Sequence, residues 1–230
     1  MSNQIRLPDT EAAARTDDAL PVAAASIADP GPLGLAGFAM TTFVLSVFNA
    51  NLLNKGLETT VLPLALFYGG GAQLLAGMWE FRKGNTFGAL AFTSFGAFWL
   101  SYYWFVHNIA AGLTPAGEAH KAVGLFLLSW TIFTAYMAIA AIRTSGAVFA
   151  VFVALFLALL FLTIGAFANK TGVTHAGGWL GLVTAVLAWY ASFAGVTNST
   201  WGRVVVPTWP MTSTTPSVRT HVGSRAPLTH

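Results

Sequence analysis

The chain has 230 residues and a formal net charge of +3, with 55% hydrophobic and only 8% charged residues. A soluble domain carries roughly 25% charged residues, so this composition excludes one and indicates a surface solvated by lipid. The eleven Lys and Arg residues are scattered between apolar runs, which excludes the basic stripe of a nucleic-acid-binding protein.

Polar segments are predicted at both ends of the chain. Residues 1–28 are rich in Ala, Asp and Thr without a sustained period, which predicts a disordered cytoplasmic tail. Their most apolar stretch, Leu20 to Ala28, is interrupted by Pro21 and flanked by acids, so we predict no signal peptide there. Residues 206–230, rich in Pro, Thr, Ser and Arg, are predicted to form a second polar tail of the same kind.

Between the tails, residues 29–205 contain six apolar segments. Each is near the length of about 20 residues that spans a hydrocarbon core of about 30 Å. The segments are Leu33–Leu53, Val61–Phe81, Phe87–His107, Ala122–Ile142, Ala147–Phe167 and Ala176–Val196. Turns rich in Gly, Asn and basic residues separate them. The sequence therefore predicts an all-α membrane protein whose transport domain is a bundle of six transmembrane helices.

Basic residues predict the orientation of this bundle. Eight lie in the tails or in the turns at Arg82 and Arg143, against three, Lys55, Lys121 and Lys170, in the opposite turns. The positive-inside rule then places both termini in the cytoplasm, and we expect a multi-pass protein of the plasma membrane. The turns alone tie at three each, so the tails decide the prediction.

Polar residues near the middle of the predicted spans are neutral. Candidates to bind a solute are Thr41 and Thr42 in the first span, Gln73 in the second, and Thr93 and Ser94 in the third. They could line a path for a small polar or anionic solute. They could equally hydrogen-bond between helices, which is the commoner role of single hydroxyls. Gln73 is the stronger candidate, because a buried amide is costly unless it is satisfied.

Two further features of the second span each have two interpretations. Gly69-Gly70-Gly71 could allow close helix packing, or it could mark a break that exposes backbone groups to a cavity. Glu80 could form a local ion pair with Lys83 at the membrane interface, or it could have a functional role. With no cysteine, no metal-ligand spacing and no nucleophile–base motif, we expect neither an enzyme nor a cofactor or metal.

Three stretches carry more specific signatures. The first is Asp29-Pro30-Gly31-Pro32-Leu33-Gly34-Leu35. The second runs from Phe67-Tyr68-Gly69-Gly70 through Gln73, Glu80 and Lys83-Gly84-Asn85-Thr86-Phe87-Gly88 to Phe92-Thr93-Ser94, and the third comprises His175, Gly178-Trp179 and Gly202-Arg203. Over residues 29–207 the chain resembles the acetate uptake transporter family, which comprises bacterial succinate–acetate permeases and fungal acetate transporters.

This resemblance implies a homo-hexamer of six-helix protomers that takes up acetate and some succinate. It also implies an apolar constriction, which maps to Phe38, Phe95 and Leu155. The signature residues Asp29, Pro30, Pro32, Gly34, Glu80 and Asn85 are expected to be structural. The chain departs from the family pattern in having Asp29 for Asn, Gly31 for Ala, and Phe95 where bacterial members usually have Tyr.

The expected function is therefore passage of acetate and related small carboxylates, as the anion or the protonated acid, through an apolar constriction. Protons are a candidate co-substrate, and the sequence leaves open channel-like or proton-coupled passage. Two alternatives remain at this point. One is a neutral-solute channel like the hexameric urea channels, and the other is a membrane sensor that transports nothing.

Overall fold

The regular structure of the described residues is helical. A computed structural model describes residues 27–211, and most of these residues lie in seven α-helices joined by short 3₁₀ and π segments. The helices are α1 (Gly31–Asn49), α2 (Leu62–Leu66), α3 (Gln73–Lys83), α4 (Thr86–Trp104), α5 (Ala119–Ala141), α6 (Gly146–Ala168) and α7 (Thr171–Trp201). The connecting segments are η1 (Lys55–Val61), η2 (Phe67–Ala72), η3 (Phe105–Ile109), η4 (Ala110–Gly112) and η5 (Ala116–Glu118).

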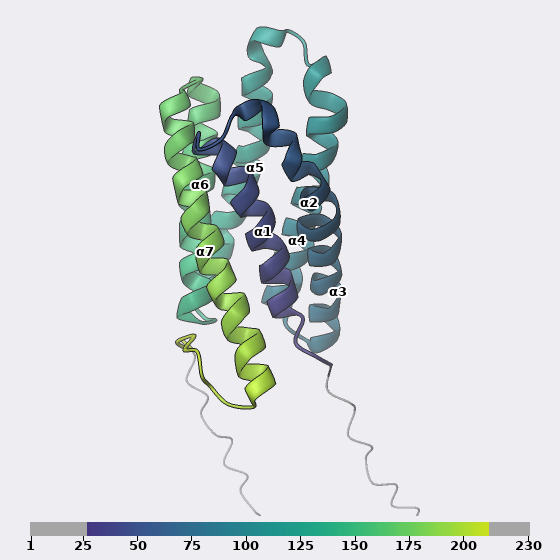
Figure 1. Ribbon diagram of the computed structural model, residues 1–230, viewed down its shortest axis with the longest axis vertical. Coiled ribbons are helices and arrows are strands. Elements are labelled where there is room, and N and C mark those ends of the chain that lie inside the picture. Colours follow the sequence, from purple (N-terminus) through teal and green to yellow (C-terminus); the bar gives the residue numbers. More distant parts are fainter. Residues whose placement is uncertain (1–26, 212–230) are drawn as a thin grey trace, which may run out of the picture.

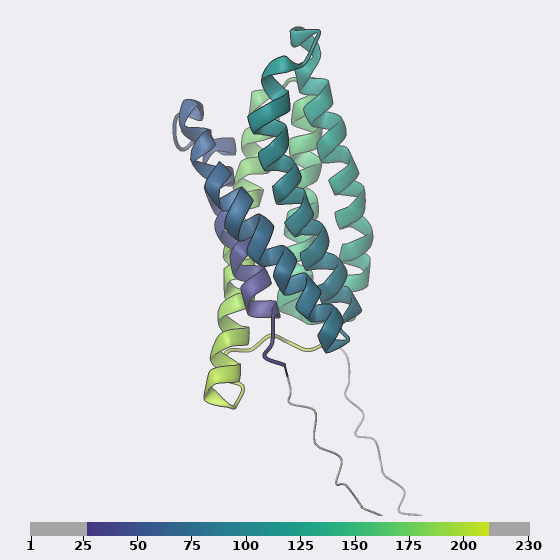
Figure 2. The same ribbon diagram turned by 90° about the vertical axis from the view of Figure 1, so that its right-hand side faces the viewer.

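These elements form an up-and-down bundle with two distinct ends (Figure 1). The terminal end holds the start of α1 and the end of α7, and the opposite end, here called the mouth end, holds η1 and the start of α5 and α7. Helices α1, α4 and α6 therefore run in the same direction, toward the mouth end. Turned by 90°, the bundle shows α2 and α3 slanting across its outer side (Figure 2).

The six predicted spans are confirmed as helical segments of the bundle. Five are long and apolar enough to cross a membrane by length and composition, namely Gly31–Asn49, Lys55–Lys83, Ala119–Ala141, Gly146–Ala168 and Thr171–Trp201. The remaining span is α4, which has 19 residues and packs along α3 inside the bundle. The last helix is longer than predicted, because the polar turn that ends it falls at Gly202, where φ is +63°.

The second span is one helical path with a changed winding in its middle. The π-helical segment η2 contains the three consecutive glycines and joins α2 to α3. A Cβ atom on Gly69 would lie 2.5 Å from Thr41 Oγ1 and 2.9 Å from Trp99 Cδ1. A side chain there would therefore push apart α1, η2 and α4. Close packing, one of the two interpretations of these glycines, has a structural basis at this position.

Signature residues from three elements meet at the terminal end. Lys83 Nζ donates to Asp29 Oδ1 at 2.8 Å, and Gly31 N donates to the same oxygen at 2.9 Å. Glu80 is only 1% exposed, and its Oε2 accepts a hydrogen bond from Asn85 Nδ2 at 2.8 Å. Lys83 Nζ lies 4.0 Å from Glu80 Oε2. The expected ion pair of Lys83 with Glu80 is therefore weaker than the contact of Lys83 with Asp29. Through that second contact, Lys83 connects α3 to the start of α1.

Residues 206–211 differ from the polar tail predicted for them. The side chain of Asn198 donates to Val206 O at 2.8 Å and accepts from Val206 N at 2.9 Å. Met211 N donates to Thr144 O at 3.0 Å, and Trp209 stacks on Tyr190. These contacts bind the segment across the terminal end to the α5–α6 turn. The rest of that tail, and residues 1–26 of the predicted N-terminal tail, lie outside the described residues.

Candidate functional site

A cavity of about 480 Å³ is lined by residues of α1, α4, α5, α6 and α7. Its wall includes the exposed side chains of Lys55, Lys170 and Thr171 at the mouth end, so the cavity reaches the surface there. Toward the middle of the bundle the wall is mostly aromatic and aliphatic, with Phe98, Phe126, Trp130, Leu159 and Leu162 among its residues. The cavity leads from one surface of the membrane domain to its centre.

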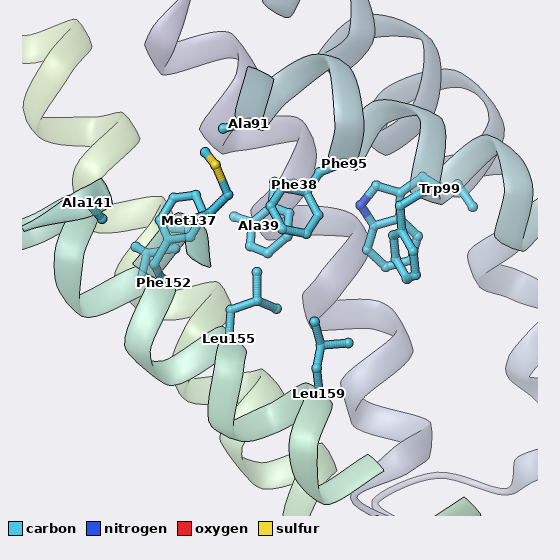
Figure 3. Packing of buried hydrophobic residues seen from close by; sticks show 14 residues of the cluster. Phe38, Ala39, Ala91, Phe95, Trp99, Met137, Ala141, Phe152, Leu155 and Leu159 are labelled. Atoms are coloured by element: carbon cyan, nitrogen blue, oxygen red, sulfur yellow. The ribbon is translucent and has the colours of Figure 1, made fainter. Parts of the chain in front are cut away.

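The three residues of the predicted constriction meet at the inner end of this cavity. Phe38 on α1, Phe95 on α4 and Leu155 on α6 all line its wall and are 5%, 4% and 7% exposed. The rings of Phe38 and Phe95 pack edge to face with centroids 5.6 Å apart. Figure 3 shows Leu155 pointing toward these two rings. We call this group of three side chains the neck.

On the terminal side of the neck the bundle is filled with apolar side chains. Phe152 lies between Phe95 and Phe87, with ring centroids 6.1 Å and 5.2 Å away. Met137 is 2% exposed and belongs to the same core, as Figure 3 shows. Phe87 and Phe95 are eight residues apart on α4, which corresponds to about 12 Å along a helix. An apolar layer of about this thickness therefore closes the cavity toward the terminal end.

The layer of residues directly outside the neck has a polar and an apolar side. Thr42, Trp99 and Leu159 each follow a neck residue by four positions on helices that run in the same direction. They therefore lie about 6 Å, one helical turn, nearer the mouth. All three line the cavity. Among the described residues, neither Thr42 Oγ1 nor Trp99 Nε1 has a hydrogen-bond partner.

Of the five predicted binding residues, Thr42 is the one in the cavity wall that the described residues form. Thr41 Oγ1 donates to Gly37 O at 2.9 Å and faces η2. Gln73 is 1% exposed where α3 meets α1, and Thr93 packs against Gly77 of α3. Ser94 is half-buried and also stands outside the cavity wall. Thr41, Gln73 and Thr93 therefore lie at contacts between helices.

The signature residues also have structural positions rather than places in the cavity wall. Pro30 is the N-cap of α1, and Pro32 O accepts a hydrogen bond from Ser192 Oγ of α7 at 2.7 Å. A Cβ atom on Gly34 would lie 2.6 Å from the ring of Phe92, so α1 and α4 are in close contact there. Asp29, Glu80 and Asn85 join the ends of α1, α3 and α4 as described above.

Several cavity residues were not among the sequence candidates. Lys55 at the mouth pairs with Glu58 at 2.9 Å and donates to Asn49 Oδ1 at 3.1 Å. His120 and Lys170 line the same rim. These residues stand in predicted turns, where the charge pattern was used only for orientation. Trp99 lies inside an apolar span, where no pattern distinguishes a cavity-lining indole from a lipid-facing one.

A helical membrane bundle whose surface cavity ends at an apolar neck is the architecture of a membrane transport protein. The chain belongs to the GPR1/FUN34/yaaH family, whose sequence model matches residues 12–213. This confirms the resemblance to acetate transporters, because the succinate-acetate/proton symporter SatP of Escherichia coli is 38% identical to the chain over 181 residues. That match covers 79% of the chain and 95% of the symporter.

Two other comparisons extend this assignment. The solved structure of the bacterial acetate channel SatP matches with a TM-score of 0.74 and 37% sequence identity, covering 79% of this chain and 99% of that one. The ammonia transport outward protein 2 of Saccharomyces cerevisiae is 42% identical over 174 residues. The chain aligns there with 74% of its own length but with only 61% of the yeast protein. These relatives are named as transport proteins, which points away from an enzyme.

Proposed function

We propose that this protein passes acetate and related small monocarboxylates, with succinate as a secondary substrate, across the plasma membrane. The observation that carries the proposal is the neck of Phe38, Phe95 and Leu155 at the inner end of an open cavity. It occurs in a chain that is 37% identical to an acetate channel of the same fold.

The chemistry of the neck favours small permeants. A carboxylate that enters it loses water without gaining a hydrogen-bond partner from the three apolar side chains, which is costly. An acid with a short alkyl chain fits more easily between the three side chains. Protonation of its carboxylate removes the charge that the apolar neck disfavours. The buried carboxyl group of Glu80 lies at the terminal end and outside the described cavity wall. It is therefore not placed to relay protons into the neck.

Orientation and assembly belong to the same proposal. With both termini in the cytoplasm, as the positive-inside rule predicts, the cavity would open to the outside and receive external acetate. A homo-hexamer is the assembly that the family resemblance implies. Protomers could pack through exposed apolar residues such as Leu125, Ile132 and Ile139 of α5, which are 64%, 60% and 70% exposed in the single chain. Native mass spectrometry of the purified protein would measure the number of protomers.

Uptake into liposomes tests the proposed function directly. Purified protein in liposomes is expected to take up labelled acetate several times faster than protein-free liposomes, because lipid alone resists the anion. Urea and ammonium uptake should stay near the protein-free rate. Rapid urea flux without acetate flux would support a neutral-solute channel, and ammonium flux alone would support a function like that in the name of the yeast relative. Absence of all three fluxes would support a membrane sensor.

The missing hydroxyl at Phe95 predicts a distinct pH dependence. An apolar neck penalises the charged anion more than the neutral acid, so uptake by the native protein should rise steeply as the external pH falls. In Phe95→Tyr a hydroxyl is added at nearly the same ring size, and the rise should be shallower because the anion is better tolerated. Acetate uptake is measured across a pH series and corrected for acid that leaks through the lipid.

A matched control makes this comparison specific to the neck. Phe161 lies on α6, is 36% exposed and does not line the described cavity. Phe161→Tyr should therefore keep the native pH profile. Superimposable profiles for the native protein and Phe95→Tyr would show that Phe95 does not line the path, and the assignment of the neck would then be withdrawn.

A further inference from the structure

One acidic side chain stands in the wall of the cavity at the mouth end. Among the described residues the acids are Asp29, Glu58, Glu80 and Glu118, and of these Glu58 alone lines the cavity. Its side chain is 25% exposed, so water and solutes that enter the mouth reach it. A carboxylate in this place repels every anion that enters the cavity.

Contacts from three elements hold Glu58 at the entrance. Lys55 Nζ lies 2.9 Å from Glu58 Oε1 within η1, and it also donates to Asn49 Oδ1 at the end of α1, at 3.1 Å. Tyr102 of α4 lies close to Glu58, and all four residues line the cavity. The carboxylate is therefore positioned between α1 and α4, with the ammonium group of Lys55 beside it.

The charges of the cavity wall largely cancel because Glu58 is present. With histidine counted as neutral, the wall holds two positive side chains, Lys55 and Lys170, against the one negative side chain of Glu58. A positive wall attracts a dianion with twice the energy of a monoanion, because the energy scales with the charge of the solute. Each positive charge left uncompensated at the mouth therefore favours dicarboxylates over monocarboxylates.

From this arrangement we infer that Glu58 is a specificity-determining residue, whose carboxylate lowers the positive potential of the mouth and so limits the entry of dicarboxylates relative to monocarboxylates. The inference rests on the proposed function and adds to it a physical basis for succinate as the secondary substrate. Glu58 discriminates by the charge of the solute, whereas the neck discriminates by its size.

Glu58→Gln should raise the uptake of succinate more than the uptake of acetate. At neutral pH succinate carries two charges and acetate carries one. In water, a unit charge about 6 Å away changes the local concentration of a monoanion about threefold and that of a dianion about tenfold. Well below saturation, acetate uptake into liposomes should therefore rise about threefold and succinate uptake about tenfold. Both gains should shrink at high salt, which screens the charge.

Charge-matched variants separate this electrostatic effect from packing. Lys55→Gln should have the opposite effect and lower succinate uptake more than acetate uptake. Lys55→Gln combined with Glu58→Gln keeps the native net charge, so it should recover the native ratio of succinate to acetate uptake. Glu118→Gln is the matched control, because Glu118 pairs with Lys121 at 2.8 Å outside the described cavity wall. It should also keep the native ratio.

An introduced cysteine provides a readout that needs no transport. The chain contains no cysteine, and Leu45 lines the cavity one helical turn before Asn49 on α1. In Leu45→Cys, the reaction rates of an anionic and a cationic methanethiosulfonate reagent report the potential inside the mouth. Addition of Glu58→Gln should raise the ratio of anionic to cationic rates about tenfold, because one rate rises about threefold and the other falls about threefold. Addition of Glu118→Gln should leave the ratio unchanged.

The outcomes separate this inference from the proposed function. If native liposomes take up neither acid, the proposed function fails, and the cysteine reaction rates alone decide whether Glu58 sets the charge of the mouth. If native liposomes take up acetate while Glu58→Gln leaves the ratio of succinate to acetate uptake unchanged, the inference is overturned and the proposed function stands. Equal gains for the two acids count as such an unchanged ratio, since they would show a wider mouth rather than a changed potential.

Discussion

Leu155→Ala is expected to raise the uptake of lactate relative to acetate by about tenfold or more. Leu155 is one of the three side chains of the neck and points toward the rings of Phe38 and Phe95 (Figure 3). Truncation to alanine removes three carbon atoms from the narrowest part of the described path. A single methylene in a pocket discriminates by about 1–3 kcal/mol, and about 1.4 kcal/mol corresponds to tenfold. The wider neck should therefore admit the larger acid.

The measurement is a competition between labelled acetate and labelled lactate in one liposome preparation. Leu157→Ala is the matched control, because Leu157 lies on the same helix, is 36% exposed and is outside the described cavity wall. It should keep the native ratio of the two uptake rates. Truncation of a buried leucine also costs about 2–5 kcal/mol of stability, so the amount of folded protein must be matched between samples. Reduced stability with an unchanged ratio would show that Leu155 only packs the core.

Glu80→Ala is expected to be among the most destabilising single substitutions in the membrane domain. The carboxyl group is 1% exposed and accepts a hydrogen bond from Asn85 Nδ2, while Asn85 also caps α4 through Gly88 N at 3.2 Å. Removing this buried side chain leaves a cavity and takes the acceptor away from Asn85 Nδ2, at a cost of about 3 kcal/mol or more. In a chain of this size that corresponds to a fall in unfolding temperature of about 10 °C. The fall is measured by thermal unfolding in detergent.

Two variants test whether the buried contact causes this loss. Glu80→Gln keeps an oxygen that accepts from Asn85, so its unfolding temperature should lie close to the native value. Glu118 is an exposed carboxylate in an equivalent i, i+3 pair, with Lys121 at 2.8 Å. Because exposed ion pairs contribute little, Glu118→Ala should change the unfolding temperature only slightly. Equal unfolding temperatures for Glu80→Ala and the native protein would contradict the structural role assigned to Glu80.

Hydropathy located the spans well because a bilayer imposes a length on every crossing helix. Their ends were less accurate where a helix is longer than the predicted span, as α7 is at Thr171–Trp201. The ordered course of residues 206–211 was missed for another reason. Their composition resembles a disordered tail, but their backbone groups bond to Asn198 near the end of α7 and to the α5–α6 turn, which is far away in the sequence.

The residues predicted to line the transport path also fall into two groups, those chosen from the family resemblance and those chosen for their polarity. The family resemblance grouped Phe38, Phe95 and Leu155, and these three side chains line the inner end of one cavity, because the resemblance carries information about three-dimensional position from related chains. Reasoning from polarity selected five neutral residues, of which Thr42 lies in the described cavity wall. Thr41 and Thr42 are adjacent and both buried, yet the first faces η2 and the second faces the cavity. Polarity at a given depth cannot separate two such neighbours.

The sequence by itself determined that this chain is a six-helix membrane protein of an acetate-transporter family, since span length and signature motifs are local properties of the chain. The tertiary structure decided which face of each helix is turned to the cavity. In a soluble helix an apolar stripe identifies the buried face, but a helix in lipid is apolar on both its inner and outer faces, so its rotation leaves little trace in the sequence. That rotation is set by contacts such as those of Gly69 with Thr41 and Trp99, and these place Thr42 and Trp99 beside the neck.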